Sequence, residues 1–182
     1  MATDKVMTPE FRVSFPHVFT PHTAFDGQPA KYSLVMLIPK NADISALKKL
    51  ALEAAKEKWG DKIPKDLRNP FRDGDTKELE GYKGCWFIQA TTKTKPGLVD
   101  NKLTPIIAPE EFYAGCYARA TVNAYAYDRA GNKGVAFGLQ NIQKLKDGEP
   151  FSGRTRAEDD FDATPDAAGA ENAKENAAAL FE

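Results

Sequence analysis

A run of alternating side chains from Cys116 to Asp128 carries the residue types best suited to binding chemistry. Every second residue is small and apolar, whereas the positions between them hold rings, hydrogen-bonding groups and one guanidinium: Tyr117, Arg119, Thr121, Asn123, Tyr125 and Tyr127. Because strand side chains alternate between two faces, the pattern predicts a strand with one buried and one exposed face. Exposed rings and cations can stack on unpaired nucleobases and bind phosphate. An ordinary half-exposed antiparallel strand with cross-strand tyrosine pairs is the alternative.

A second stretch, residues 82–95, repeats this chemistry on alternate positions. If Trp86, Ile88 and Ala90 face inward, the outer face carries one ring, hydrogen-bonding groups and two cations: Phe87, Gln89, Thr91, Lys93 and Lys95. A shift of one residue moves every side chain to the opposite face, so the other register would bury Phe87 and expose Trp86. Either aromatic ring can therefore be the contact residue.

These patterns predict nucleic-acid contacts of two kinds. Cations that can meet phosphates come from predicted strands and from a long polar loop at residues 61–81: Arg12, Lys31, Arg72, Lys93, Lys95 and Arg119. Rings that can stack on bases are Phe87, Tyr117, Tyr125 and Tyr127. Phe71, near Arg72, is either a further stacking ring or an anchor that holds the loop to the core.

The elements that must position these side chains are mostly strands. Alternating or continuous apolar residues predict strands at residues 10–19 and 31–38 and a hairpin of residues 115–128 and 133–145. Pro16 lacks a backbone N–H, so the first strand is expected to bend, bulge or reach an edge there. Apolar residues recur at helical spacing from Ile44 to Trp59, which predicts a helix with Asn41 or Asp43 as its N-cap. The fold class is therefore mainly β with one inserted helix.

Residues typical of catalytic, metal or cofactor sites are scarce in the sequence. The two histidines, His17 and His22, are five residues apart, and no phosphate-loop, dinucleotide-binding or zinc-protease motif occurs. Cys85 and Cys116 fall in predicted strands, where reduced thiols acting as small core residues are expected. The acidic residues at 73 and 75 lack further oxygen ligands at cation-loop spacing, which predicts an acid-rich turn. We therefore expect no enzyme activity, no metal and no cofactor.

Membrane-spanning and secretory features are also missing from the sequence. No apolar run approaches the roughly 20 residues that a spanning helix needs, and the first ten residues lack the apolar part of a signal peptide. The sequence therefore predicts a soluble protein of the cytoplasm that does not bind membranes.

The charge of the chain changes sign after Arg156. Residues 1–156 carry 24 Lys and Arg against 18 Asp and Glu, whereas residues 157–182 carry one Lys against eight acids. The net charges, +6 and −7, give a basic body with an acidic end, an asymmetry that often marks nucleic-acid-binding proteins. We expect a folded domain at residues 1–152 and a disordered acidic tail at 153–182, because the tail has too few apolar residues to offset its ordering entropy. Its apolar tip, Leu180 and Phe181, resembles a docking peptide; a passive solubility tail is the alternative.

Several short motifs together resemble a family of bacteriophage proteins. In chain order they are R-V-S-F-P-H-V-F at 12–19, Y-S-L-V-M-L-I-P-K at 32–40, R-D-G-D at 72–75, Y-A-G-C at 113–116, N-K-G-V at 132–135 and G-L-Q-N at 138–141. Over residues 8–148 they are similar to phage single-stranded DNA-binding proteins grouped with the Enc34 protein. The resemblance implies a five-stranded OB-fold barrel, binding of single-stranded DNA without catalysis, and a role in phage replication or recombination.

The acidic tail is also similar to the tails of bacterial single-strand binders and of the phage T7 counterpart. In those proteins the tail recruits replication proteins and competes with DNA, which implies partners of that kind for this tail. Those tails end on their aromatic residue, whereas here Glu182 follows Phe181. A protein-interaction module that uses the tyrosine-rich face is the alternative function. The choice between DNA and RNA, and between monomer and dimer, stays open.

Overall fold

Five strands close into a barrel in this computed structural model, which describes residues 5–23, 27–151 and 161–164. The barrel strands are β2 (Phe11–His22), β3 (Lys31–Pro39), β5 (Cys85–Thr92), β7 (Tyr117–Arg129) and β8 (Asn132–Lys146). Their order around the barrel is β2-β3-β5-β8-β7 and back to β2, with β5 and β8 parallel and the other neighbours antiparallel. This is the arrangement of an OB-fold, as predicted.

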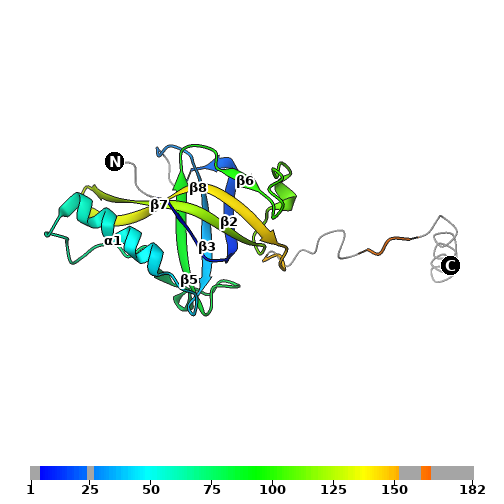
Figure 1. Cartoon of the computed structure of the whole chain (residues 1–182), viewed down its shortest axis with the longest axis horizontal. Helices are drawn as coiled ribbons and strands as arrows, with labels where there is room; N and C mark the ends of the chain where they lie inside the picture. Colours follow the sequence, from blue (N-terminus) through cyan, green and yellow to red (C-terminus); the bar gives the residue numbers. More distant parts are fainter. Residues whose placement is uncertain (1–4, 24–26, 152–160, 165–182) are drawn as a thin grey trace.

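The helix α1 (Ser45–Trp59) follows the second barrel strand, between β3 and β5, as predicted. Figure 1 shows it lying across the β7–β8 hairpin at one end of the barrel. The N-cap is Ile44 rather than the predicted Asn41 or Asp43, and no side chain caps the helix. Asp43 lies one residue earlier, and its carboxylate accepts the N–H of Ser45. Hydrogen bonds from the side chain and from the backbone of Ser45 lower the pKa of the Asp43 carboxyl below its usual value. The helix ends at Gly60, which adopts a left-handed conformation with φ 60° and donates its N–H to the carbonyl of Lys56.

The barrel interior is filled by alternate residues of every strand. In β3, for example, Leu34, Met36 and Ile38 have no exposed surface. The helix completes this core with one buried stripe: Leu47, Leu50, Ala51, Ala54 and Ala55. Truncating one of the large buried side chains to alanine costs about 2–5 kcal/mol of folding free energy, so this core holds the outer faces of the strands in register.

The long polar loop predicted at residues 61–81 lies within the connection of residues 60–84, which is held against the barrel at several points. The short strand β4 (Arg72–Asp73) pairs with β5 and leads into the 3-10 turn η1 (Gly74–Thr76). The ring of Phe71 packs edge-on against Phe137 of the core at a centroid distance of 5.7 Å. Phe71 is therefore the anchor of the loop rather than an exposed stacking ring.

The acidic residues of this loop form a pinned turn, as predicted. The ammonium group of Lys40 lies 2.7 Å from a carboxylate oxygen of Asp73 and 2.7 Å from one of Asp75. The same Asp73 oxygen also accepts the backbone N–H of Asp75, and the other oxygen of Asp75 accepts the backbone N–H of Gly84. The hydrogen bonds to Lys40 lower the pKa of both carboxyls and raise the pKa of Lys40.

Three further short elements complete the described chain. The strand β1 (Val6–Met7) extends the sheet beside β7, and β6 (Gly97–Val99) runs parallel to β8. A 3-10 turn, η2 (Pro109–Glu111), precedes β7. Figure 1 shows β6 beside β8 at the edge of the barrel farthest from α1. The hairpin is therefore flanked by an edge strand on each side.

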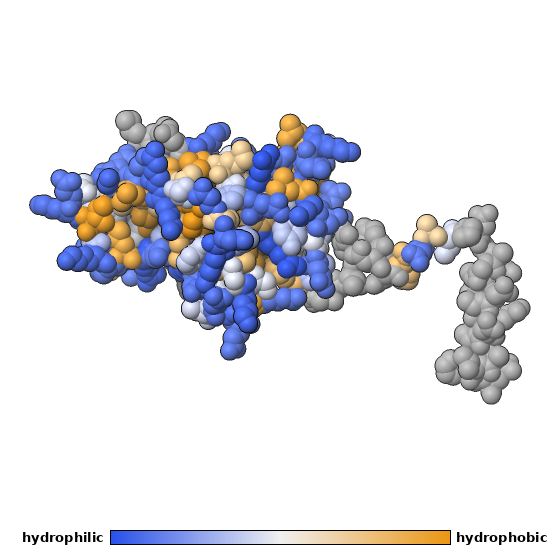
Figure 2. All heavy atoms as spheres, turned by 60° about the horizontal axis from the view of Figure 1, so that its bottom comes forward, coloured by the Kyte–Doolittle hydropathy of each residue, from blue (hydrophilic) through white to orange (hydrophobic). Residues whose placement is uncertain are grey.

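Polar side chains dominate the surface, with apolar areas among them, as Figure 2 shows for one face. The most exposed large apolar side chains of the body are Leu103 and Ile107, which are 69% and 83% exposed. Of the predicted tail, the described residues 161–164 are exposed and irregular, whereas Leu180 and Phe181 lie outside the described residues.

Candidate nucleic-acid interface

The outer face of the β7–β8 hairpin carries the side chains that the sequence singled out. Ala118, Ala120, Val122 and Ala124 are at most 3% exposed, whereas Tyr125 on the opposite face is 41% exposed. The two faces of this strand are therefore divided as predicted. We call the outward residues of β7 the tyrosine strip: Arg119, Thr121, Asn123, Tyr125 and Tyr127.

Small residues on β8 let the tyrosine strip lie flat across the neighbouring strand. Tyr127 pairs with Gly134, Tyr125 with Ala136, and Asn123 with Gly138. A Cβ atom on Gly134 would lie 2.6 Å from the Tyr127 hydroxyl, and one on Gly138 would lie 2.2 Å from the Asn123 side-chain oxygen. The strip is therefore a flat surface rather than a row of upright side chains.

The tyrosine strip is an extended track and not a single cluster. Tyr125 and Tyr127 are two residues apart on one face. Arg119 lies six residues from Tyr125, roughly 20 Å along an extended strand. Its Nε donates to the side-chain oxygen of Gln143 at 2.7 Å, which orients the guanidinium on the outer face.

Phe87 is the outward ring of β5, which settles the register that the sequence left open. Ile88 and Ala90 have no exposed surface, and Trp86 is partly buried against the same core. Two cations from the loop, Arg72 and Lys77, lie 5.9 Å and 5.7 Å from the centroid of the Phe87 ring. The structure thus brings Arg72 next to Phe87, whose ring has two cations beside it.

The predicted lysines gather at the opposite end of β5 from Phe87. Lys31 begins β3, and Lys93 follows Thr92, whose Cα partner on β3 is Tyr32. Lys95 lies in the same exposed turn, before β6. Lys31 and Lys93 therefore lie at one end of the β3–β5 face, with Lys95 next to them in the chain.

Arg12 and Tyr117 are placed differently from the other candidates. Arg12 donates from Nε to the carbonyl of Gly115 at 3.0 Å and from Nη2 to that of Glu149 at 2.6 Å. Its guanidinium lies 4.2 Å from the centroid of the Phe151 ring and 5.7 Å from that of Tyr117. Arg12 thus clamps the chain after β8 onto β2, which leaves it less free to bind phosphate than the lysines.

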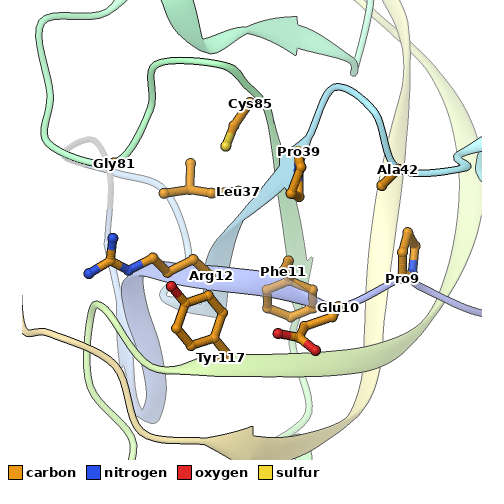
Figure 3. Close-up of a pocket in the computed structure, with 10 residues that line it drawn as sticks. All are labelled: Pro9, Glu10, Phe11, Arg12, Leu37, Pro39, Ala42, Gly81, Cys85 and Tyr117. Carbon is orange, nitrogen blue, oxygen red and sulfur yellow. The ribbon is translucent and has the colours of Figure 1, made fainter.

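A hollow of about 430 Å³ opens beside this clamp (Figure 3). Figure 3 shows the side chains of Arg12 and Tyr117 next to each other, below Leu37 and Cys85. Burial raises the pKa of the Cys85 thiol, and it raises the pKa of the core thiol Cys116 to about 11. Neither thiol is a reactive nucleophile at neutral pH.

Sequence reasoning missed the contact between the two histidines. Their rings stack with centroids 4.3 Å apart and an angle of 11° between planes. The contact depends on the irregular register of β2, where Phe15 has φ 44° before Pro16. Partial burial, and then repulsion by His22, lowers the pKa of His17. Spacing alone could not reveal this pair, because a bulge changes which residues share a face.

Two kinds of site are not found among the residues that the structure describes. No group of three or more His, Cys, Asp or Glu in that part of the chain is arranged to hold a metal ion. No helix within the same residues has the length and apolar character to cross a membrane.

Comparison with known proteins identifies the family. Residues 4–173 match the family described as Enterobacter phage Enc34, ssDNA-binding protein. The putative protein p50 of Acyrthosiphon pisum secondary endosymbiont phage 1 is 36% identical over 162 residues, which span 82% of this chain and 87% of that protein.

Solved structures show the same fold. The single-stranded DNA-binding protein from bacteriophage Enc34, in complex with ssDNA, is 26% identical with a TM-score of 0.69, covering 81% of this chain and 89% of that one. The single-stranded DNA-binding protein gp2.5 of bacteriophage T7 shares the fold at 13% identity and a TM-score of 0.60, covering 92% and 100% of the two chains. The sequence match and the shared barrel agree, and this chain belongs to the family of the Enterobacter phage Enc34 ssDNA-binding protein.

Proposed function

We propose that this protein binds single-stranded DNA without sequence preference during phage replication or recombination. The observation that carries the proposal is the outer face of the barrel, where rings and cations lie on neighbouring strands. OB-folds bind oligonucleotides on the face of their second and third strands and on the loops after the first and fourth. In this chain those strands are β3 and β5, Lys31 follows the first of the two loops, and Tyr127 precedes the other.

The cations of this face bind the phosphates of the strand. Lys31, Lys93 and Lys95 form one end of the track, Arg119 lies on the hairpin, and Arg72 lies beside Phe87 at the other end of β5. Each phosphate contact releases a condensed counterion, so the affinity falls as salt rises.

The rings of this face stack on the bases. Tyr125, Tyr127 and Phe87 lie on the outer surface, where every base can offer a ring face regardless of its identity. Tyr117, flanked by the cations of Arg12 and Lys146, is a fourth ring at the Arg12 clamp. Binding by stacking and charge explains why little sequence preference is expected.

Binding is the whole activity that we propose, without catalysis and in the cytoplasm of the host cell. The two thiols have raised pKa values, and the carboxylates of the acid-rich turn are occupied by Lys40 and by backbone N–H groups. Labelled DNA incubated with the protein and magnesium or manganese should stay intact. Cleavage of the DNA would contradict this part of the proposal and indicate a nuclease.

The acidic tail regulates this binding in our proposal. Residues 157–182, with a net charge of −7, compete with DNA for the basic face. The tip of the tail, Leu180 and Phe181, docks a replication or recombination protein when DNA displaces the tail.

Titration with oligo-dT, followed by intrinsic tyrosine and tryptophan fluorescence, tests the proposed function. Stacking on the strip should quench the fluorescence, and added salt should reverse the quenching. A signal that stays unchanged at saturating oligonucleotide would contradict DNA binding and favour a protein-interaction module on the same face.

A further inference from the structure

A small hollow lies where the edge strands β1 and β6 flank the β7–β8 hairpin. Its volume is about 150 Å³, and it opens to solvent on the same face as Arg119. Its apolar lining comes from Met7, Val99 and Leu103. Its polar lining includes the side chains of Thr121 and Gln143 from the hairpin. The hollow thus combines apolar walls with hydrogen-bonding groups, which is how sites for flat polar rings are built.

Leu103 is held in this hollow by a strained turn. Its φ of 66° is left-handed, a conformation that costs a leucine free energy that glycine would avoid, and its side chain is still 69% exposed. Asp100 builds the turn, because its carboxylate accepts the N–H groups of Lys102 at 2.8 Å and Thr104 at 2.9 Å. A strained, exposed leucine contributes little to the core, so its position indicates a role at the surface.

The guanidinium of Arg119, which lines the hollow, has hydrogen-bond donors that the protein does not use within the described residues. Arg119 uses Nε for Gln143, and its two terminal nitrogens make no hydrogen bond to another described residue. Lys102 precedes Leu103 in the same turn, and Lys95 lies two residues before β6. Arg119, which lines the hollow, therefore offers positive charge next to the apolar walls.

We propose that this hollow is a subsite for one nucleobase of the bound strand, an inference that rests on the proposed function. A cavity of about 150 Å³ accommodates one six-membered ring, the size of a pyrimidine base. Met7 and Leu103 contact the faces of the base. The amide nitrogen of Gln143 donates one N–H to the Asp100 carbonyl at 3.4 Å, and its second N–H meets the polar edge of the base. Arg119 binds the adjoining phosphate with its terminal nitrogens. Because Arg119 belongs to the tyrosine strip, the subsite continues the same DNA track towards β6.

Replacement of Leu103 by glycine tests the subsite without disturbing the turn. Glycine adopts φ 66° without strain, so Leu103→Gly removes the apolar wall and keeps the backbone. The full-length variant is titrated with labelled oligo-dT and with an oligomer of equal length made of abasic sugar-phosphate units. We expect a loss of about threefold to tenfold in affinity for oligo-dT, unchanged affinity for the abasic oligomer, and an unchanged salt dependence. Met7→Ala, on the facing strand β1, should give the same pattern.

Ile107→Ala is the matched control. Ile107 is 83% exposed in the same connection but does not line the hollow, so this variant should bind both oligomers as the wild type does. The subsite would be overturned if a variant lost affinity equally for the two oligomers. It would also be overturned if both Leu103→Gly and Met7→Ala bound oligo-dT as tightly as the wild type does. If the wild type itself fails to bind oligo-dT, the proposed function fails first and the subsite falls with it.

Discussion

Tyr125 is the most exposed ring of the tyrosine strip, and its partner on β8 is only an alanine. A base can therefore approach the ring from the solvent side without moving another side chain. Tyr127 is less exposed, because its ring lies against Gly134 and near Arg68 of the loop. At the scale of single residues, Tyr125 is thus the ring whose removal reports most directly on stacking.

Replacing Tyr125 by alanine should weaken oligo-dT binding by about 1–3 kcal/mol, which is about fivefold to 150-fold in affinity, because one stacked base loses its ring. Tyr125→Phe keeps the ring and should bind as the wild type does. Fluorescence anisotropy with labelled oligo-dT measures both. An unchanged affinity for Tyr125→Ala would show that this ring lies off the DNA track.

Replacing Lys93 and Lys95 together by alanine should change the salt dependence of binding. The plot of log affinity against log salt has a negative slope, and each lost phosphate contact should make it shallower by about 0.7. The slope is measured from titrations at several salt concentrations. Lys49→Ala, on the exposed side of α1, is the control and should leave the slope as it is. A double variant with the wild-type slope would remove these lysines from the phosphate contacts.

The sequence predicted which face each of these residues occupies, because the period of two is a property of the strand backbone. It could not predict what else would contact them. Arg12 has an outward position, yet two carbonyls that are 103 and 137 residues away in the chain hold its guanidinium. The hollow beside Arg119 depends in the same way on Met7 and Leu103, which come from short elements without a periodic pattern.

At the scale of elements, the loop of residues 60–84 matters most for the face. It carries β4 against β5, places Arg72 beside Phe87, and is pinned through Lys40 on the segment after β3. The barrel strands and α1 were predictable, because each carries a long periodic pattern. The path of this loop was not, since long-range pairs such as that between Lys40 and Asp73 leave no local signal.

The ion pairs of Lys40 with Asp73 and Asp75 should make the free energy of unfolding depend on pH in the acid range. The folded-state pKa values of Asp73 and Asp75 lie below their ordinary 3.8. The stabilisation that these ion pairs give the folded state is therefore present above about pH 4, and it is lost as the pH falls through the folded-state pKa values. Lys40→Met should lower the melting temperature at pH 7, and this difference from the wild type should shrink towards pH 3.

Melting curves recorded by circular dichroism at several pH values measure that difference. Lys49→Met removes a lysine from the exposed side of α1, so its effect on the melting temperature should not vary with pH in this range. If Lys40→Met were as destabilising at pH 3 as at pH 7, the stabilisation would come from packing of the lysine stem and not from the ion pairs.

At the scale of the whole molecule, the opposite charges of body and tail set the proposed regulation. Deleting residues 157–182 removes a net charge of −7 and leaves a body of +6. We expect this truncation to tighten binding to oligo-dT at low salt, with a smaller gain at high salt because ions screen the competition. Equal affinities of the full and truncated chains at low salt would leave the tail as a passive solubility segment.

The central claim is that the outer face of this barrel binds an unpaired strand through both rings and cations. The most direct test compares the affinity of the full chain for oligo-dT and for a duplex of equal length at two salt concentrations. We predict much tighter binding to oligo-dT than to the duplex at both salt concentrations, because a duplex keeps its bases stacked inside and leaves none free to stack on the rings. The affinity for oligo-dT should also fall steeply as the salt concentration rises. Equal affinity for the two forms would reduce the interface to charge alone and contradict the account.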